Sequence, residues 1–223
     1  MLSKQLGDID ELLQGARLAF LPSATGVRMR ITVMGHDVFA VENNVEGVEQ
    51  RIRAKVQKYI YGTGEEELEE ALGRLLTNHG LTIAVAESCT GGLVADKITN
   101  VSGSSNYFER GVITYSNLSK IELLGIPEEL IKAHGAVSKE IAEAMAAGIR
   151  RASRTDIGLS TTGIAGPTGG TQEKPVGLVW IGYADKDTTL ALKFNFGDNR
   201  SRTKERAAQA ALELVRRRVL KIE

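Results

Sequence analysis

The chain is poor in the residues that build metal sites and disulfide frameworks. Its 223 residues include one cysteine, three histidines and one tryptophan, and aromatic residues make up only 5%. A single cysteine excludes an internal disulfide and fits a reducing, cytoplasmic setting. The histidines are scattered, and no CxxC or HExxH pattern occurs, so we expect neither a metal site nor a cofactor.

Long apolar runs and an excess of charge of one sign are also missing. No apolar stretch approaches the roughly 20 residues that cross a bilayer, and the first residues lack the apolar core of a signal peptide. Basic and acidic residues number 28 each, so the formal net charge is zero. Because nucleic-acid binding depends on neutralising phosphates, this composition predicts neither a membrane nor a nucleic-acid partner.

What is present divides into two patterns that meet at 61–67, where glycines are followed by an acidic run. We therefore expect a small domain over 1–63 and a larger one over 64–223. In the first, periodicity predicts a helix over 3–13, strands over 17–20 and 27–33, and a helix over 46–58. Val27, Met29 and Ile31 alternate with arginine or threonine, which predicts one buried face and an α+β unit.

In the larger domain, strands alternate with helices. Strands are predicted over 81–86, 111–115, 156–161, 177–184 and 189–196. Helices are predicted around the Leu68–Leu76 stripe, which ends at a Gly80 cap, over 91–99, after the Ser138 cap, and over 201–220. This order predicts an α/β fold in which a mixed sheet is sandwiched by helices.

The stretch Ala84–Gly92 carries the strongest chemical signal. An apolar run ends at Ala86, and Glu87 and Ser88 follow, just before a helix that begins near Leu93. A hydroxyl beside free backbone N–H groups suits a nucleophile whose substrate develops an oxyanion, and it also suits anion binding. Serine, threonine and glycine are ordinary helix-start residues as well, so Ser88 is either a nucleophile or a cap.

A nucleophilic serine needs a general base, and two side chains are candidates. His134 precedes a glycine and is typical of a helix end, where histidine commonly interacts with the helix dipole. Lys120 follows the strand predicted over 111–115, near the strand ends that Ser88 should share. It acts as a base only if burial or a nearby cation lowers its pKa. Tyr115 could relay a proton or orient the pair.

Cys89 is a rival nucleophile, because a thiolate is intrinsically more reactive than a hydroxyl. A free cysteine, however, is more often a small buried hydrophobe. We therefore expect Cys89 to point away from the site if Ser88 points into it.

Glycine and serine gather in three loops of the larger domain, at 88–92, 102–106 and 161–170. Such loops allow backbone N–H groups to approach a phosphate or a planar ring closely. Three of them at apparent strand or helix ends favour a small phosphorylated or nucleotide-like ligand over a protein partner.

Taken together, these motifs resemble those of the CinA (competence/damage-inducible protein A) proteins. Residues 65–220 are similar to the CinA C-terminal domain, whose members include the nicotinamide mononucleotide (NMN) deamidases, and residues 1–63 resemble the KH-like unit that precedes it. The matching segments run in order along the chain: Thr82–Gly92, Gly103–Ser105, Gly111–Asn117 with Lys120, His134–Ser138, Thr162–Pro167 and Lys174–Gly177.

The resemblance implies hydrolysis of the NMN carboxamide to nicotinate mononucleotide and ammonia by a Ser-Lys amidase mechanism. The family's serine, lysine and tyrosine correspond to Ser88, Lys120 and Tyr115, and backbone N–H groups after the serine would hold the oxyanion. The nucleotide-binding residues are expected to be Glu87, Thr90, Gly91, Ser105, Asn106, Thr162, Gly163, Ala165, Gly166 and Arg200. The resemblance also suggests a homodimer.

Two departures from the family pattern bear on these expectations. Thr168 stands where many relatives carry aspartate, and the family's Gly-Asp-Arg reads Gly197-Asp198-Asn199-Arg200, so its arginine corresponds to Arg200 or a near neighbour. The family's larger N-terminal domain is similar to molybdopterin-binding proteins and is associated with ADP-ribose pyrophosphatase activity. It has no counterpart in this sequence, so neither that activity nor its metal is expected.

The alternative to an enzyme is a binding module, either an inactive nucleotide sensor or a nucleic-acid partner in competence or the DNA-damage response. A functional KH unit clamps a nucleic-acid backbone with a GxxG loop. Residues 1–63 contain no GxxG, and their basic and acidic side chains nearly balance. We therefore expect this unit to be a spacer or a dimer contact.

Overall fold

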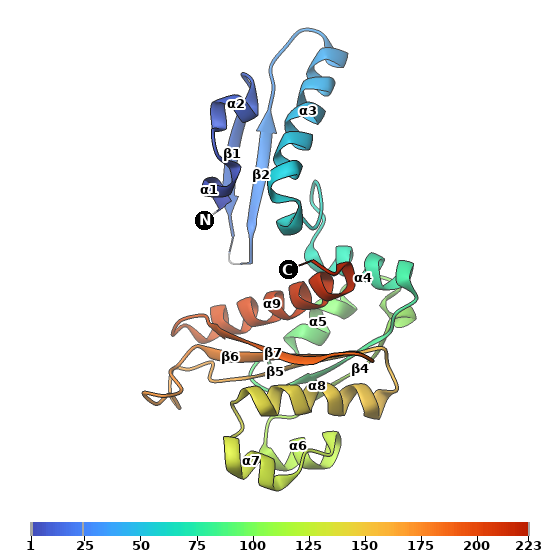
Figure 1. Ribbon diagram of the computed structural model, residues 1–223, viewed down its shortest axis with the longest axis vertical. Helices are drawn as coiled ribbons and strands as arrows, with labels where there is room; N and C mark the ends of the chain where they lie inside the picture. Colours follow the sequence, from blue (N-terminus) through green and yellow to red (C-terminus); the bar gives the residue numbers. More distant parts are fainter. Residues whose placement is uncertain (1, 24, 223) are drawn as a thin grey trace. The chain divides into compact units, whose positions relative to one another are not determined.

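The computed structural model describes residues 2–23 and 25–222, which form two compact units. One unit spans Met1–Tyr61 and the other Gly62–Glu223. Each has buried apolar residues of its own at its centre, and Figure 1 traces the chain through both. Among the described helices, none is long and apolar enough to cross a membrane.

The N-terminal unit is a small α+β domain made of two short helices, a hairpin and a long helix. Its elements are α1 (Leu2–Leu6), α2 (Ile9–Leu13), β1 (Arg17–Pro22), β2 (Val27–Thr32), α3 (Val38–Val56) and the 3-10 helix η1 (Gln57–Tyr59). The two strands pair antiparallel, and the predicted α+β unit is confirmed. Met29 and Ile31 pack against the core while Arg28 and Arg30 are exposed, as the alternation predicts, but Val27, expected on the same buried face, is exposed.

The boundaries of two helices in this unit differ from the prediction. The single helix expected over 3–13 is two helices, because Gly7 adopts a φ of 77° and Asp8 caps α2 through two backbone N–H groups. α3 begins well before residue 46, because Asp37 caps it in the same way. Both differences arise from caps, which apolar periodicity does not register.

The C-terminal unit is built on a five-stranded sheet in the order β4-β3-β5-β6-β7. The strands are β3 (Ile83–Glu87), β4 (Phe108–Ile113), β5 (Ile157–Gly163), β6 (Leu178–Ala184) and β7 (Thr189–Asn195). β4, β3 and β5 run parallel, whereas β6 and β7 form an antiparallel extension. The predicted mixed sheet is confirmed, with the strand expected over 111–115 lying slightly earlier in the chain.

Helices cover both faces of this sheet (Figure 1). The elements on one face are α4 (Leu68–His79), α5 (Leu93–Thr99) and α9 (Arg200–Leu220). On the other face lies α8 (Lys139–Ser153), with α6 (Asn117–Leu124) and α7 (Glu128–His134) packed against it. The predicted sandwich is confirmed, and α6 is a helix that the sequence pattern did not predict.

The apolar stripes predicted for three of these helices are confirmed. The fully buried side chains are Leu68, Leu72 and Leu76 of α4, Ala142, Met145, Ala146 and Ile149 of α8, and Ala208, Ala211, Leu212 and Val215 of α9. Burial of each larger apolar side chain contributes about 1.5–3 kcal/mol. Gly80 ends α4 in the left-handed conformation and Ser138 caps α8, as their sequence context predicts.

Two glycines allow α8 to lie directly on the sheet. A Cβ atom on Gly158 of β5 would overlap the carbonyl oxygen of Ala146, and one on Gly182 of β6 would overlap that of Ala142. The helix backbone therefore occupies space that any other side chain would fill. Ser160 strengthens the contact by donating a 2.6 Å hydrogen bond to the Ala142 carbonyl.

Strand direction decides which loops can share a site. The carboxyl ends of β3, β4 and β5 lie at one edge of the sheet, and β7 ends at the same edge, where α9 begins. This carboxyl edge carries residues 88–92, 114–116, 164–170 and 196–200. In open α/β sheets, ligands bind outside the carboxyl ends of parallel strands, so this edge is where a site is expected.

Candidate active site

Ser88 and Lys120 meet in the interior of the carboxyl edge. Lys120 is only 1% exposed and Ser88 8%, and the Lys120 Nζ atom lies 3.3 Å from Ser88 Oγ. The same Nζ donates to the carbonyl of Thr114 at 2.8 Å and to that of Tyr115 at 3.4 Å. Among described residues, Lys120 forms no ion pair, which is rare for a buried lysine.

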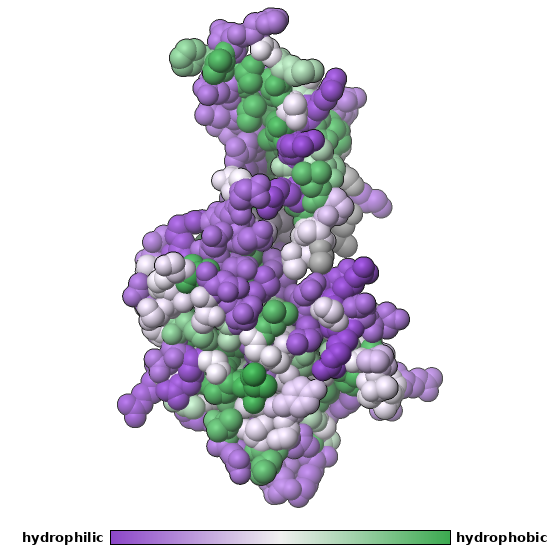
Figure 2. Space-filling view, turned by 180° about the vertical axis from the view of Figure 1, so that it is seen from behind, coloured by the Kyte–Doolittle hydropathy of each residue, from purple (hydrophilic) through white to green (hydrophobic). Residues whose placement is uncertain are grey.

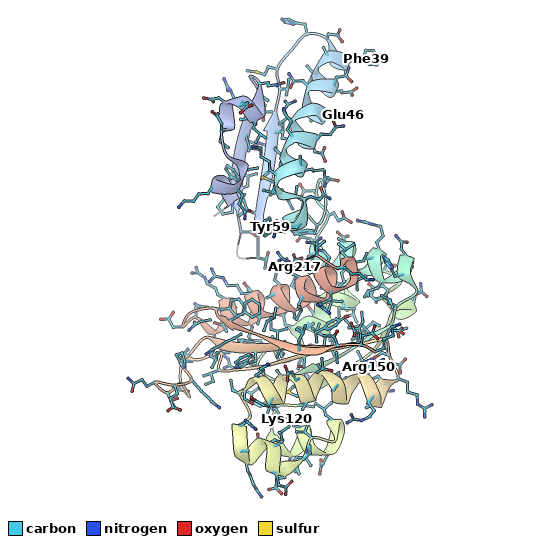
Figure 3. All side chains as sticks on the ribbon, viewed as in Figure 1. Phe39, Glu46, Tyr59, Lys120, Arg150 and Arg217 are labelled. Carbon is cyan, nitrogen blue, oxygen red and sulfur yellow. The ribbon has the colours of Figure 1, made fainter. Side chains whose placement is uncertain are left out.

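The local sequence places Lys120 here by starting a helix immediately after β4. Ser116 caps α6 by accepting the N–H of Ser119, and the Ser119 hydroxyl accepts the N–H of Ser116 in return. This reciprocal cap fixes the start of α6, and Lys120 lies on the buried side of its first turn. Figure 3 labels Lys120 between α6 and α8. Burial lowers the pKa of Lys120 below its ordinary value.

The three contacts of Lys120 can be made by an ammonium or by a neutral amine. An ammonium offers three donors, whereas a neutral amine offers two donors and one lone pair. The two backbone carbonyls, of Thr114 and Tyr115, can accept only, but the Ser88 hydroxyl can also donate. A neutral Lys120 would therefore donate to both carbonyls and accept the Ser88 proton, which is the arrangement of a base and its nucleophile.

The turn after Ser88 presents free backbone donors. The Ser88 N–H donates to the Thr161 carbonyl at 2.9 Å, which ties Ser88 to β5. Within the described part of the chain, the N–H groups of Cys89, Thr90 and Gly91 have no acceptor. Gly91, at a φ of 63°, continues the turn in a conformation that other residues adopt at a cost. Successive free N–H groups of this kind form a site for an anion or an oxyanion.

The structure corrects the role expected for Glu87. Its carboxylate is 1% exposed and accepts the N–H groups of Gly92, Val94 and Ala95 at 2.9, 3.1 and 2.8 Å. Glu87 therefore caps α5 and is not presented to a nucleotide. Because its carboxylate fills the helix N-terminus, the free donors beside Ser88 belong to the turn and not to the helix itself.

Two neighbours of Ser88 turn their side chains into the fold. Cys89 is 6% exposed, and burial raises the pKa of its thiol to about 12, so almost no thiolate forms near neutral pH. The thiol also interacts electrostatically with Lys120, so Cys89 lies close to the site, and the expectation that it points away is not confirmed. Thr90 is fully buried with its hydroxyl 2.6 Å from that of Thr161, so only its backbone N–H is available to a ligand.

Tyr115 contributes differently from the proton relay considered for it. Its ring is 63% exposed, and its hydroxyl lies 3.4 Å from the guanidinium of Arg200. Only its backbone carbonyl contacts Lys120. Arg200 also donates to the carbonyl of Gly166 at 2.9 Å, so the start of α9, the third glycine-rich loop and Tyr115 are brought together at the carboxyl edge.

Some of the remaining residues of the third loop lie at the same edge as Ser88, and the side chain of one of them is buried in the fold. Gly163 and Ala165 lie at or just after the end of β5, on the same edge as Ser88, and a Cβ on Gly163 would lie 2.6 Å from the Leu178 carbonyl. Thr162 is 1% exposed and its hydroxyl donates to the Ala136 carbonyl at 2.7 Å. The side chain of Thr162 is therefore structural, which corrects its expected role in binding.

Ser105 and Asn106 lie at the other end of the sheet from Ser88. Both belong to the 3-10 helix η2 (Ser104–Asn106), which precedes the first residue of β4. Because β4 runs parallel to β3 and its first residues pair with Ile83, η2 lies beside the amino end of β3. These two residues therefore cannot join Ser88 within one chain, which corrects their expected place in the nucleotide site.

The alternative base is engaged elsewhere. The His134 Nδ1 atom lies 3.6 Å from the Glu140 carboxylate, and the His134 carbonyl accepts from Lys174 at 2.8 Å. This histidine therefore links α7 to the start of α8, and of the two candidate bases only Lys120 contacts Ser88. No cluster of three His, Cys, Asp or Glu side chains that could hold a metal occurs among described residues.

Sequence reasoning missed Lys204. Its Nζ atom lies 3.5 Å from the position that a Cβ on Gly91 would occupy, so the ammonium approaches the turn after Ser88. Lys204 is half-buried and forms no hydrogen bond or ion pair with any residue that the structure describes. The signal in the sequence is its spacing of one helical turn from Arg200, which puts both side chains on one face of α9.

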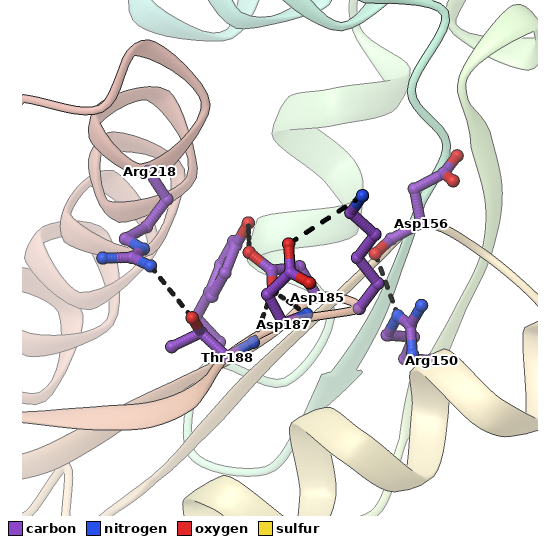
Figure 4. Close-up of polar contacts among 8 residues, drawn as sticks. Arg150, Asp156, Asp185, Asp187, Thr188 and Arg218 are labelled. Atoms are coloured by element: carbon purple, nitrogen blue, oxygen red, sulfur yellow. Dashed lines mark hydrogen bonds and ion pairs between the residues drawn. The ribbon is translucent and has the colours of Figure 1, made fainter.

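A separate hollow of about 450 Å³ lies at the opposite edge of the sheet, beside the β6–β7 hairpin. Arg150, Arg151 and Arg154 line it from the end of α8, together with Asp156 and Asp185. Both carboxylates are engaged within the fold, and Figure 4 shows Arg150 donating to the Asp156 carbonyl. This hollow is remote from the carboxyl edge and shares no residue with it.

Comparison with protein families finds two matches that together cover nearly the whole chain. The CinA C-terminal domain matches residues 65–219. The damage-inducible protein CinA KH domain matches residues 1–62. The carboxyl edge with Ser88 and Lys120 lies within the first match.

Individual relatives agree with these matches. A "CinA-like protein" of Chloroherpeton thalassium is 47% identical over 220 residues, which are 96% of this chain and 52% of the relative. A "putative competence-damage inducible protein" of Caldicellulosiruptor saccharolyticus is 44% identical over 219 residues, 98% of this chain and 53% of that protein. The chain thus spans about half the length of these relatives.

Solved structures resemble only part of the chain. The competence/damage inducible protein CihA from Agrobacterium tumefaciens is 38% identical, with a TM-score of 0.64, over 69% of this chain and 97% of that one. A CinA superfamily protein from Klebsiella pneumoniae is 26% identical, with a TM-score of 0.68, over 71% of this chain and 99% of that one.

Proposed function

The chain belongs to the CinA family, and on that premise we propose that its C-terminal unit hydrolyses the carboxamide of NMN to nicotinate mononucleotide and ammonia. The observation that carries this proposal is the 3.3 Å contact between Ser88 Oγ and the buried amine of Lys120. A hydroxyl beside an amine whose pKa is lowered by burial is the pairing that amide hydrolysis requires.

The first half of the reaction forms an acyl-enzyme. Neutral Lys120 removes the Ser88 proton while Oγ attacks the amide carbon, and the carbonyl oxygen becomes an oxyanion. The free N–H groups of Cys89, Thr90 and Gly91 are the donors available to it. Lys120 then returns the proton to the amide nitrogen, the C–N bond breaks, and ammonia leaves.

The second half hydrolyses the ester between Ser88 and the nicotinoyl group. Lys120, neutral again, removes a proton from water, and the resulting hydroxide attacks the acyl carbon. The same backbone donors stabilise the second oxyanion. When the C–O bond breaks, Lys120 returns its proton to Ser88 Oγ, and the product is released as a carboxylic acid that loses its own proton to water to give nicotinate mononucleotide. Each proton removed by Lys120 is thus given back within the cycle.

The test is ammonia release from NMN by the wild type, Ser88→Ala, Lys120→Ala and Cys89→Ala. We expect the first two substitutions to reduce kcat about 10²- to 10⁶-fold, the range that removal of a general base or a nucleophile produces. Cys89→Ala should retain activity, since its thiol is buried and protonated. Loss of activity in Cys89→Ala alone, in a variant that still folds, would move the nucleophile by one residue.

The competing hypothesis is a nucleotide sensor without turnover. In that case the wild type would bind nicotinate mononucleotide in calorimetry and release no ammonia from NMN. A nucleic-acid-binding module would instead show affinity that falls steeply with salt, because counterions are released on binding. We expect no such salt-dependent binding, given the zero net charge of the chain.

We also propose that two copies of the chain associate, as the family resemblance suggests. The N-terminal unit exposes several large apolar side chains, namely Phe20, Leu21, Val27, Met34, Val38 and Phe39. Figure 2 shows apolar surface on this unit, and Figure 3 places Phe39 at the first turn of α3. Light scattering should report a dimer for the wild type and a lower mass for Phe39→Ser with Met34→Ser. A wild-type monomer at micromolar concentration would contradict the proposal.

A further inference from the structure

The first two turns of α9 present two cations to the carboxyl edge. Arg200 opens the helix and Lys204 follows one turn later on the same face. Between them, Thr203 is buried and donates to the Gly197 carbonyl at 3.2 Å, which fixes the start of the helix against the loop before it. The direction of both side chains is therefore set by buried contacts of the helix itself.

The two cations have different neighbours at the carboxyl edge. The Arg200 guanidinium is held by the Gly166 carbonyl at 2.9 Å and the Tyr115 hydroxyl at 3.4 Å. These contacts use two of its five N–H donors and leave the others for a ligand. The Lys204 ammonium lies beside Gly91, whose own N–H lacks an acceptor among described residues.

A half-buried ammonium beside unused N–H donors creates a positive potential that no carboxylate of the turn offsets. Glu87, the acid nearest in sequence, is consumed by the cap of α5. An anion placed between Lys204 and Arg200 would gain charge-assisted hydrogen bonds from both.

The amount of charge points to the kind of anion. A phosphomonoester carries about −1.5 to −2 charges near neutral pH, as phosphorylated side chains do. Two cations match that charge, whereas a carboxylate would balance only one of them. A planar arginine and a point-like lysine are also a common combination around phosphate oxygens.

We propose that Lys204 binds the phosphate of the substrate together with Arg200 and the N–H of Gly91, and that it makes the protein prefer a nucleotide to its nucleoside. The inference rests on the proposed deamidase function for the identity of the substrate. It adds a specificity-determining residue and assigns the anion at this edge as a phosphomonoester.

The first test is calorimetric binding of the product nucleotide, nicotinate mononucleotide, and of its nucleoside, nicotinate riboside. We expect Lys204→Gln to weaken nucleotide binding about 10- to 100-fold, the effect of losing one hydrogen bond between charged groups. The affinity of Lys204→Gln for the nucleoside should equal that of the wild type, because the nucleoside has no phosphate. Lys204→Arg should restore most of the nucleotide affinity.

The matched control is Arg202→Gln. Arg202 belongs to the same turn of α9, but its spacing from Arg200 and Lys204 directs it to another face, where it is exposed. Arg202→Gln removes the same charge from the same helix as Lys204→Gln. Unchanged nucleotide affinity in this variant would show that the affinity depends on the position of the charge and not on the net charge of α9.

Kinetics with NMN provide a second reading. Lys204→Gln should raise KM for NMN by a similar factor and change kcat much less, since the phosphate is remote from the bond that breaks. Equal weakening of nucleotide and nucleoside, unchanged nucleotide affinity, or a wild type that binds no nucleotide would overturn the inference. A wild type without deamidase activity but with Lys204-dependent nucleotide binding would reject the proposed reaction and keep the phosphate site.

Discussion

Lys120 Nζ and Ser88 Oγ lie 3.3 Å apart although the residues are 32 positions apart in the chain. Strand β4 makes this possible, since it returns the chain to the carboxyl edge and ends just before α6 begins. The lysine enters the interior without a carboxylate partner and hydrogen-bonds to backbone carbonyls instead. Its burial therefore opposes folding while it prepares the amine to accept a proton.

Because the buried lysine costs stability, we expect Lys120→Met to make the protein more stable and less active. Methionine fills a similar volume without a charge, so the free energy of unfolding should rise by about 1–2 kcal/mol at pH 7. Ammonia release from NMN should fall about 10²- to 10⁴-fold, because the general base is gone. Urea denaturation and the ammonia assay test both parts, and a destabilised variant would contradict this account of the buried lysine.

The lowered pKa of Lys120 predicts how the free-energy cost of burying this side chain varies with pH. Below the folded pKa, both the folded and the unfolded states carry the proton, and the full cost of burying the charge opposes folding. Between that pKa and the ordinary value of 10.5, only the unfolded state binds the proton, so the free energy of unfolding rises with pH. The stability advantage of Lys120→Met should therefore shrink as pH approaches 10.

The same titration should appear in catalysis. If neutral Lys120 is the base, kcat/KM for NMN should rise with pH through the lowered folded pKa of the lysine. Urea denaturation of wild type and Lys120→Met across pH, beside the pH profile of kcat/KM, would locate the same group twice. A constant stability difference from pH 6 to 10 would contradict the assignment.

Glu87→Gln tests the cap that sets the turn after Ser88. The carboxylate accepts three backbone N–H groups, whereas an amide presents one oxygen and an NH2 group to the same donors. We expect a loss of about 2–3 kcal/mol in the free energy of unfolding, the range for hydrogen bonds to a charged group. Activity should fall as well, since the free donors of the turn would shift.

Glu109→Gln is the matched control for that substitution. Glu109 is exposed on β4 and pairs with its equally exposed neighbour Arg110, so its loss should change the free energy of unfolding by less than about 0.5 kcal/mol. Equal effects of the two substitutions in urea denaturation would mean that the Glu87 cap contributes little.

Gly158→Ala should disrupt the contact between α8 and the sheet. The added methyl group would overlap the Ala146 carbonyl, so the helix must move away at a cost of about 1–3 kcal/mol. Gly26→Ala is the control, because a Cβ there meets nothing within 4 Å and the φ of Gly26 is not positive. Thermal unfolding of both variants tests this prediction. A Gly158→Ala variant with the melting temperature of the wild type would contradict the close packing.

The sequence predicted those parts of the fold that regular patterns encode. The stripe from Ala142 to Ile149 in α8 and the cap at Ser138 match because both follow helical spacing. α6 escaped prediction because Asn117–Leu124 is short and its start depends on a reciprocal cap between two serines. The break at Gly7 was hidden for the same reason, since a local cap can override an apolar stripe.

Some residues of the candidate site could be predicted from the sequence in the same way, and others could not. Ser88 and Lys120 each follow a strand, and two parallel strands bring them to one edge, so their meeting could be inferred from the order of elements. Ser105 sits in another loop of glycine and serine residues, but that loop precedes β4, and strand direction places it at the opposite edge. The sequence shows that Lys204 lies one helical turn after Arg200, but only the packing of α9 reveals that its amine faces Gly91.

The backbone contact of α8 with Gly158 and Gly182 also limits how the two edges of the sheet can communicate. A shift of α8 along the strands by one residue would bring its carbonyl groups against positions that carry side chains, so this contact opposes sliding of the helix over the sheet. Occupation of the arginine-lined hollow could not reach Ser88 by sliding this helix.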